Sequence, residues 1–190
     1  MSNLLLPPIR IAVPSDATQI AQIYALNVQD TAFTFEVEPP TAVEMQRRMQ
    51  KISERLPWLV MDLEGQIAGY AYASPHRERA AYQWAVEVSV YVAPKAYRQG
   101  VARALYKSLL QILEAQGFYK VYAGITLPNN PSVNLHESFG FELIGTYQDV
   151  GYKLGRWHNV GWWQLTLKPP LAQPEPPSSF NQLLQRSNNE

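Results

Sequence analysis

The apolar positions of the chain follow two spacings. Alternation of apolar and polar residues over a short stretch is typical of a strand, whereas apolar residues three and four positions apart are typical of an amphipathic helix. Strand-type runs occupy residues 9–13, 57–63, 66–73, 82–92, 119–125, 141–147 and 160–167. Helical spacing is found in residues 17–24, 41–52, 101–117 and 132–139.

Polar residues and glycines mark the ends of these helices. Ser15 and Asp16 offer a cap to the first helix, and Thr41 with Glu44 has the spacing of a capping box before the second. Gly117 is placed to end the long third helix. The resulting order, β-α-α-β-β-β-α-β-α-β-β, predicts an α/β fold in which helices flank a mixed central sheet.

The composition changes after Lys168. Proline fixes φ and lacks a backbone donor, so a proline-rich segment is expected to stay extended. We therefore expect one domain over residues 1–168 and a disordered C-terminal tail, outside the core, over residues 169–190. The alternative is a short helix that docks on the body or on a partner, capped by Ser178 and Ser179 and carrying Phe180, Leu183 and Leu184.

Composition and charge narrow the classes of function. The chain has 190 residues, 46% of them hydrophobic, which is enough for one sizeable core. Sixteen basic residues balance 16 acidic ones, which removes the electrostatic argument for nucleic acid or an anionic membrane as a partner. The absence of cysteine excludes disulfides, thiolate metal sites and a cysteine nucleophile, and we expect no metal. No stretch has the pattern of a signal peptide or a membrane span, so we expect a cytoplasmic protein.

One acidic residue, Glu87, stands in the middle of the strand-type run 82–92. Alternation places the valines at 86, 88, 90 and 92 on a core face and puts Glu87 on the opposite face with Ser89 and Tyr91. A carboxylate in an apolar segment is costly unless it faces water, a partner or a cleft. Glu87 is therefore a candidate functional residue, and the alternative is a solvent-facing strand position.

The same strand leads through residues 97–102 directly into the long helix. Gly100 and the small Ala102 allow backbone N–H groups to approach an anion closely, and the helix N-terminus carries a partial positive charge. Arg98 and Arg103 could supplement these donors. The pattern indicates a pyrophosphate cradle, although glycine at a strand–helix turn also serves turn geometry alone.

A further candidate lies in residues 129–141, which predict a strand end, a short capped helix and a glycine stop. His136 falls within this helix, and Asn129 and Ser132 stand near its start. A lone helical histidine is more often a hydrogen-bonded structural group than a catalyst, and Asn129 and Ser132 could be simple caps.

Together these segments are similar to the GNAT superfamily of acetyl-CoA-dependent N-acetyltransferases. The resemblance is carried by the valine-rich strand, by a loop like Gln/Arg-x-x-Gly-x-Gly/Ala and by the later Asn-x-x-Ser and Leu-His pattern. Residues 57–60, 68–73, 81–92, 127–129, 135–137, 151–158 and 160–164 resemble phosphinothricin acetyltransferases more specifically. The likeness covers about residues 9–168. Tyr97 and Ala102 depart from the usual loop residues, and Asn159 stands where close relatives usually carry Asp, which bears on substrate contacts.

The resemblance implies where acetyl-CoA would bind. The strand that ends at Val92 is expected to diverge from its neighbour, so that the pantetheine arm pairs with its main chain like an added strand. The residues implied are Val90, Tyr91 and Val92 on this strand, Arg98, Gln99, Gly100, Val101, Ala102 and Arg103 in the cradle, and Asn129 and Ser138 beyond it.

It also implies a catalytic role for two side chains. Attack of an amine on the thioester requires the free base, so Glu87 is expected to accept the amine proton, directly or through a water. A backbone N–H near Tyr91 would stabilise the oxyanion. His136 matches the helix position where other members of the superfamily carry a Tyr that can protonate the leaving thiolate.

The acceptor implied is a small amino acid analogue such as phosphinothricin, methionine sulfoximine or methionine sulfone, and a homodimer is also implied. Candidate acceptor contacts are Phe35, Arg79, Tyr82, Ser89, Lys153 and Trp163. Phe35 and Trp163 could instead be core residues, and Arg79 and Lys153 solvated surface. Two other functions stay open: acetylation of a protein N-terminus or a polyamine, and a non-catalytic acyl-CoA-binding sensor.

Overall fold

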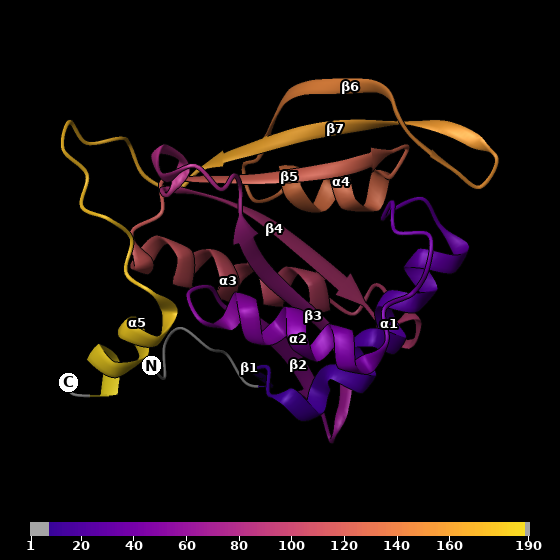
Figure 1. Ribbon diagram of the computed structural model, residues 1–190, viewed down its shortest axis with the longest axis horizontal. Helices are drawn as coiled ribbons and strands as arrows, with labels where there is room; N and C mark the ends of the chain where they lie inside the picture. The colour runs from indigo at the N-terminus through magenta and orange to yellow at the C-terminus, as the bar shows by residue number, and fades with distance from the viewer. Residues whose placement is uncertain (1–7, 189–190) are drawn as a thin grey trace.

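The computed structural model describes residues 8–188, which fold around one seven-stranded sheet (Figure 1). The strands lie in the order β1-β2-β3-β4-β5-β7-β6, and every neighbouring pair is antiparallel except β4 and β5. Their bounds are β1 Ile9–Ile11, β2 Trp58–Leu63, β3 Gln66–Pro75, β4 Ala85–Val92, β5 Lys120–Leu127, β6 Glu142–Lys153 and β7 Arg156–Thr166. The mixed sheet and the order of its elements confirm the predicted fold class.

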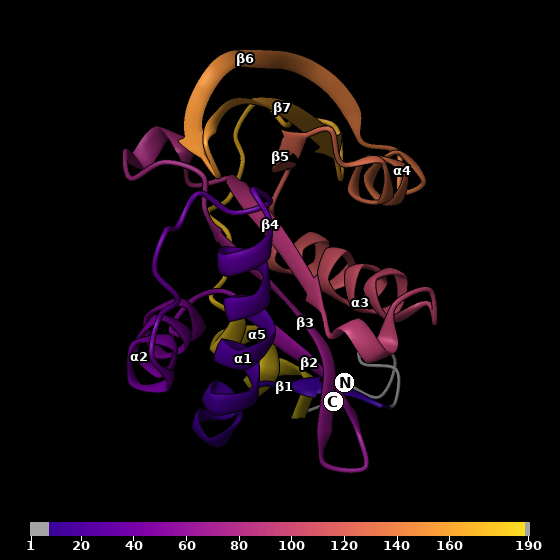
Figure 2. The same cartoon turned by 90° about the vertical axis from the view of Figure 1, so that its right-hand side faces the viewer.

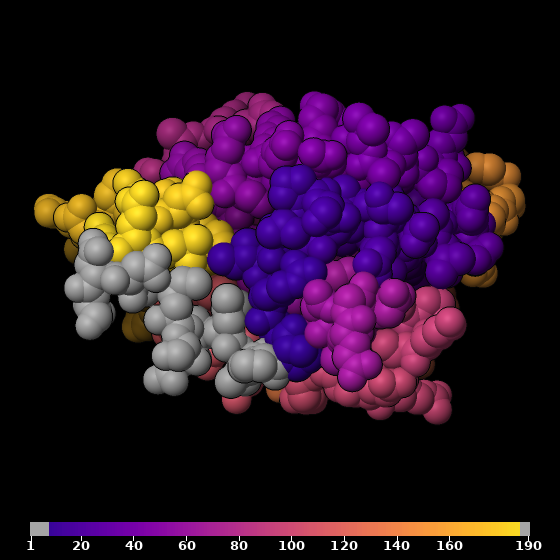
Figure 3. Space-filling view, turned by 90° about the horizontal axis from the view of Figure 1, so that it is seen from below, coloured from indigo at the N-terminus to yellow at the C-terminus, as the bar shows by residue number. Residues whose placement is uncertain are grey.

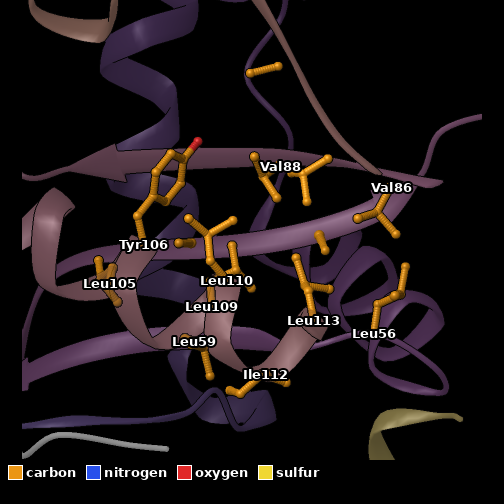
Figure 4. Close-up of a cluster of buried hydrophobic side chains, with 14 of the residues drawn as sticks. Leu56, Leu59, Val86, Val88, Leu105, Tyr106, Leu109, Leu110, Ile112 and Leu113 are labelled. Carbon is orange, nitrogen blue, oxygen red and sulfur yellow. The ribbon is translucent and has the colours of Figure 1, made fainter. Parts of the chain in front are cut away.

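Helices cover both faces of the sheet (Figure 2). α1 (Ala17–Asp30) and α2 (Ala42–Ser53) lie on one side, and α3 (Val101–Gln116) and α4 (Asn130–Glu137) lie on the other. Each face has its own apolar cluster. Val86, Val88 and the α3 leucines form one of them (Figure 4), and Tyr24, Tyr70 and their neighbours under α1 and α2 form the other. None of the helices in residues 8–188 is both long and apolar enough to cross a membrane.

The helix signals in the sequence are confirmed only in part. Thr41 accepts a hydrogen bond from the Glu44 backbone N–H, but the Glu44 carboxylate pairs with Arg47 and Arg48 instead of completing a capping box. Asp16 does not cap α1 with its side chain; its carboxylate accepts from Arg10 and from the Val13 N–H instead. Gly117 ends α3 with φ +102°, as predicted.

The strand-type run at 82–92 is shorter than predicted. Residues Ala80–Tyr82 form a 3-10 turn in which Tyr82 N–H donates to the Arg79 carbonyl, so β4 begins at Ala85. The tip of the β6–β7 hairpin extends beyond the predicted strands, since its pairing continues to Lys153 and Arg156.

The proline-rich segment does not end in a free tail, which corrects the expectation of disorder. α5 (Phe180–Asn188) packs on the body next to the end of α2 (Figure 3). Phe180 is only 3% exposed. The Gln116 side-chain amide donates to the carbonyls of Arg55 and Ser178, and Ser179 Oγ accepts from the Gln182 N–H. The docking alternative is therefore the one that the structure shows.

Candidate functional site

The centre of the sheet opens where β4 and β5 separate. Their parallel pairing covers only Ala85, Val86 and Glu87 of β4, and from there the two strands diverge (Figure 1). β5 continues against β7, while β4 continues against β3 as far as Val92. A cavity of about 570 Å³ occupies this opening, lined by residues 88–92 of β4, 123–126 of β5, the start of α3, and α4.

Alternation along β4 decides which backbone groups face the opening. The Ala93 N–H donates to Ala68 in β3, and the Trp84 carbonyl accepts from Lys120 in β5. In an antiparallel ladder, successive residues direct their N–H and C=O groups to opposite sides. The Val88 N–H completes the last pairing with Tyr122 of β5. The Val88 carbonyl and both backbone groups of Val90 and Val92 are therefore directed into the gap left by β5, and an extended chain could pair with them as an added strand.

The N-terminus of α3 lines the same cavity. Arg98 and Gly100 adopt left-handed φ values of +61° and +80°, so the chain turns tightly from β4 into the helix. Gly100 provides no side-chain cap, and the first N–H groups of a helix have no partner within the helix. Together with the helix dipole, these donors suit an anion such as a diphosphate.

A hydrogen-bonded pair, Tyr106 of α3 and His136 of α4, forms another wall of the cavity. His136 Nδ1 lies 2.8 Å from the Ser132 carbonyl, which can only accept, so Nδ1 carries the proton. His136 is 3% exposed, and this burial lowers its pKa below the ordinary 6.5, which favours the neutral ring. Nε2 then accepts from the Tyr106 hydroxyl at 3.0 Å. Burial also raises the Tyr106 pKa, so the phenol stays protonated.

Glu87 lies at the point where the strands part, one residue before the cavity-lining run of β4, and does not itself line the cavity. Its Oε1 accepts from His76 Nδ1 at 2.9 Å and from Arg77 Nη1 at 3.1 Å. The carboxylate is 29% exposed, so it is neither sealed in the core nor free in solvent.

Residues 9–162 match the family described as "Acetyltransferase (GNAT) domain". The chain belongs to the GNAT acetyltransferases. It is 42% identical to a phosphinothricin N-acetyltransferase of Streptomyces viridochromogenes, over 92% of this chain and 95% of that protein. It is 32% identical to an L-methionine sulfoximine/L-methionine sulfone acetyltransferase of Pseudomonas paraeruginosa, over 87% and 98%.

Solved structures confirm the GNAT fold. A phosphinothricin acetyltransferase from Sinorhizobium meliloti, solved in complex with AcCoA, superposes with a TM-score of 0.84 at 35% identity, covering 90% of this chain and 97% of that one. The unpaired β4 edge and the free amides at the start of α3 suit the two parts of such a substrate, an extended arm and a diphosphate. The chain is accordingly an N-acetyltransferase of the GNAT type.

Most residues that were predicted to bind the coenzyme line this GNAT cavity. They are Val90, Tyr91, Val92, Arg98, Gly100, Val101, Ala102, Arg103 and Asn129. His136, predicted to be catalytic, and Ser89, predicted to contact the acceptor, line the same cavity. Asn129 also caps α4, since its Oδ1 accepts from the Ser132 N–H. Tyr91 contributes differently from what was expected, because its backbone faces β3 and its ring packs edge-on against Tyr24.

Two predicted coenzyme residues lie outside the cavity. The Gln99 side chain is exposed and donates to the Lys95 carbonyl. The Ser138 hydroxyl is exposed, donates to the Leu135 carbonyl and accepts from Arg103 Nη2. Ser138 therefore touches the cavity only through Arg103, whose guanidinium also lies over the Phe139 ring.

The predicted acceptor residues are not gathered in one place. Trp163 is a core residue, 3% exposed, which corrects its expected position. Lys153 is buried and donates to the Thr34 carbonyl at 2.7 Å, and Phe35 packs against the neighbouring His158 ring. These two residues fasten the loop after α1 to the β6–β7 hairpin.

The other acceptor candidates lie nearer to Glu87. Tyr82 is half-exposed, and its ring meets the His76 ring edge-on at 5.9 Å. Arg79 is exposed at the start of the same 3-10 turn. Ser89 follows Glu87 by two residues and lies on the same face of β4.

Three residues of the site were missed in the sequence. Tyr106 has the helical spacing of a core residue, and nothing in the pattern separates it from the α3 leucines. His76 and Arg77 follow the strand-type run 66–73 and reach Glu87 only through the β3–β4 register, in which Ser74 pairs with Glu87. That register is the signal that could have found them.

Proposed function

We propose that this chain transfers the acetyl group of acetyl-CoA to the α-amino group of a small amino acid analogue such as phosphinothricin, methionine sulfoximine or methionine sulfone. The observation that carries the proposal is the opening between β4 and β5, with a carboxylate at its start and a free helix N-terminus at its other end. The names of the curated relatives support the acceptor class.

The coenzyme is proposed to bind along the open edge of β4. The Val88 carbonyl and the backbone groups of Val90 and Val92 would pair with its extended arm, and the first-turn amides of α3 with Arg98 and Arg103 would hold its diphosphate. The oxyanion donor is proposed to be the N–H of Val90 or Val92 and not that of Tyr91, because only the even-numbered residues face the gap.

Glu87 is proposed to be the general base. An α-amino group is mostly protonated near neutral pH, with a reference pKa of about 7.7–8.0 for a chain terminus, and only the free base attacks. Attack forms the C–N bond, the C–S bond breaks, and Glu87 takes the amine proton directly or through a water. Oε1 is occupied by two donors, which leaves Oε2 for this proton.

His136 is proposed to act in its neutral form, as the group that holds Tyr106 in the cavity wall. Its Nδ1 proton is committed to the Ser132 carbonyl, and Nε2 faces the Tyr106 hydroxyl without a proton of its own to give. This geometry favours a positioning role over the proton donation expected from the sequence. The departing thiolate would then take its proton from solvent.

A homodimer is proposed to form through the β6–β7 hairpin. β6 is an edge strand, and the hairpin exposes Leu143, Ile144, Tyr147, Val150, Tyr152, Leu154 and Trp157. Exposed apolar residues on an unpaired strand edge favour association with a second strand or surface. Sedimentation velocity tests this: the chain should sediment as a dimer, Trp157→Lys should shift it toward the monomer, and a monomeric parent would refute the proposal.

The proposed function is tested by thiol release from acetyl-CoA across a panel of acceptors. Release should depend on phosphinothricin or a methionine derivative and be far slower with a polyamine or a peptide N-terminus. Faster release with a polyamine or a peptide N-terminus would refute the proposed amino acid analogue and make that compound the acceptor. Tight acetyl-CoA binding without acceptor-dependent release from any amine would support the non-catalytic sensor instead.

A further inference from the structure

His76 is held in a fixed orientation at the point where the sheet splits. It follows Pro75, the last residue of β3, and its side chain is 14% exposed. Its ring stacks on Tyr122 of β5 at 4.3 Å with an interplanar angle of 20°, and meets the rings of Tyr82 and Trp162 edge-on. Aromatic contacts from three different segments leave the imidazole little freedom to turn.

This orientation directs one ring nitrogen to the proposed base. His76 Nδ1 lies 2.9 Å from Glu87 Oε1, and an ionised carboxylate can only accept, so Nδ1 is the donor. Arg77 Nη1 donates to the same oxygen at 3.1 Å. Within residues 8–188, Glu87 Oε2 has no hydrogen-bond partner. The two oxygens of Glu87 are thus unequal, one fixed by N–H donors and one open.

The strand register places the contact between His76 and Glu87 at the point where β4 and β5 separate. Ser74 of β3 pairs with Glu87, and Glu87 pairs with Tyr122 in the last pairing before β4 and β5 separate. The His76 ring therefore spans from the end of β3, past Glu87, to Tyr122. The hydrogen bond from this ring holds the Glu87 carboxylate at the last position where β4 is paired with both β3 and β5.

We propose that His76 is a positioning residue for the reaction: its Nδ1–H fixes Oε1 of Glu87, and this leaves Oε2 as the proton acceptor for the amine. The inference rests on the proposed role of Glu87 as the base. Placement matters here because a shift of about 1 Å in a catalytic group can cost about a hundredfold in rate. Arg77 adds charge to the same oxygen, but its side chain is 47% exposed, so the ring gives the firmer restraint.

Two substitutions separate the hydrogen bond from the packing. His76→Phe keeps a ring to stack on Tyr122 and removes the donor, whereas His76→Asn removes the ring and keeps an amide N–H near the position of Nδ1. We expect His76→Phe to lower kcat about tenfold or more, with the KM for acetyl-CoA within about twofold of the parent, and His76→Asn to recover part of the loss. Wild-type kcat in His76→Phe, or a loss in both variants that follows their unfolding temperatures, would overturn the inference.

A double-mutant cycle with Glu87→Gln gives a second measurement. If His76 acts through Glu87, adding His76→Phe to Glu87→Gln should lower the residual kcat little further, because the base is already absent. A full additional loss would show a role independent of Glu87 and refute the inference. Glu87→Gln that turns over like the parent would refute the proposed base itself, an outcome distinct from a silent His76→Phe.

Discussion

The Tyr106 hydroxyl lies 3.0 Å from Nε2 of His136, thirty residues further along the chain, and the two side chains join α3 to α4 across the cavity wall. Tyr106 also meets the His136 ring edge-on at 5.1 Å. The pair is buried, and both imidazole nitrogens have hydrogen-bond partners, because the Ser132 carbonyl accepts from Nδ1. The hydrogen bond from the Tyr106 hydroxyl to Nε2 therefore requires a neutral imidazole.

This dependence gives a prediction for stability against pH. Burial lowers the pKa of His136 below the ordinary value of 6.5, so as pH falls through 6.5 the unfolded chain gains a proton that the folded chain does not. The stabilising effect of the neutral ring is present above pH 6.5 and is lost as pH falls toward the lowered pKa. Urea unfolding over this range should show it, and His136→Gln should have a flatter pH dependence. Equal slopes in the two proteins would contradict the prediction.

The same pair predicts the pH dependence of catalysis. If His136 stays neutral and only positions Tyr106, kcat should not fall as pH rises through 6.5. A proton donor titrating in this range would instead give a falling limb. If kcat of the parent falls as pH rises through this range and kcat of His136→Gln does not, His136 is the general acid.

Glu87→Gln removes the proposed proton acceptor while nearly preserving its volume. General-base catalysis typically contributes about a hundredfold to ten-thousandfold, so kcat should fall by about a hundredfold or more. Acetyl-CoA binding should be retained, because Glu87 lies outside the cavity lining. Steady-state kinetics measures kcat, and isothermal titration calorimetry measures acetyl-CoA binding. An unchanged kcat would exclude Glu87 as the general base.

The turn before α3 can be tested with a control on the same helix. Gly100 has φ +80° and Gly117 has φ +102°, and neither has a neighbour that blocks a Cβ. Alanine at either position should cost about 1 kcal/mol of unfolding free energy through left-handed strain. Only Gly100→Ala should also weaken acetyl-CoA binding, by several-fold, because Gly100 shapes the proposed diphosphate site. Equal binding in both variants would place the diphosphate elsewhere.

The C-terminal segment should be part of the folding unit. Phe180 is 3% exposed, and Phe→Ala changes in cores typically cost about 3–5 kcal/mol, so Phe180→Ala should destabilise the whole protein by about that amount. Leu171→Ala, at a position 65% exposed, is the control and should change stability by less than about 0.5 kcal/mol. Urea denaturation measures both, and a silent Phe180→Ala would show that α5 detaches freely.

The sequence predicted the order of the elements because spacing and stop residues determine local structure. α3 is the clearest case, since its apolar period runs unbroken to Gly117. The cavity lining on β4 and α3 was also predictable, because it consists of one strand and the turn that follows it. Those positions are contiguous in the chain, so no long-range contact had to be known.

What could not be predicted depends on contacts between distant segments. His76 reaches Glu87 only through a hairpin register, and the burial of Trp163 depends on its place in the β5–β7 pairing. Prolines in the last segment suggested disorder. In the structure, however, the Gln116 side chain donates hydrogen bonds to the carbonyl of Arg55 in the body and to that of Ser178 in the last segment. Composition describes a segment alone and carries no information about the partner it meets.

The separation of β4 from β5 leaves one strand with a neighbour on a single side. The amide hydrogens of Ser89 and Tyr91 are in the β3 ladder, whereas those of Val90 and Val92 face the gap. Deuterium should therefore enter the second set quickly and the first set slowly, and saturating acetyl-CoA should protect the amides of Val90 and Val92 selectively. A substrate that completes the ladder in this way acts as a temporary eighth strand, so each turnover assembles and then dismantles part of the sheet.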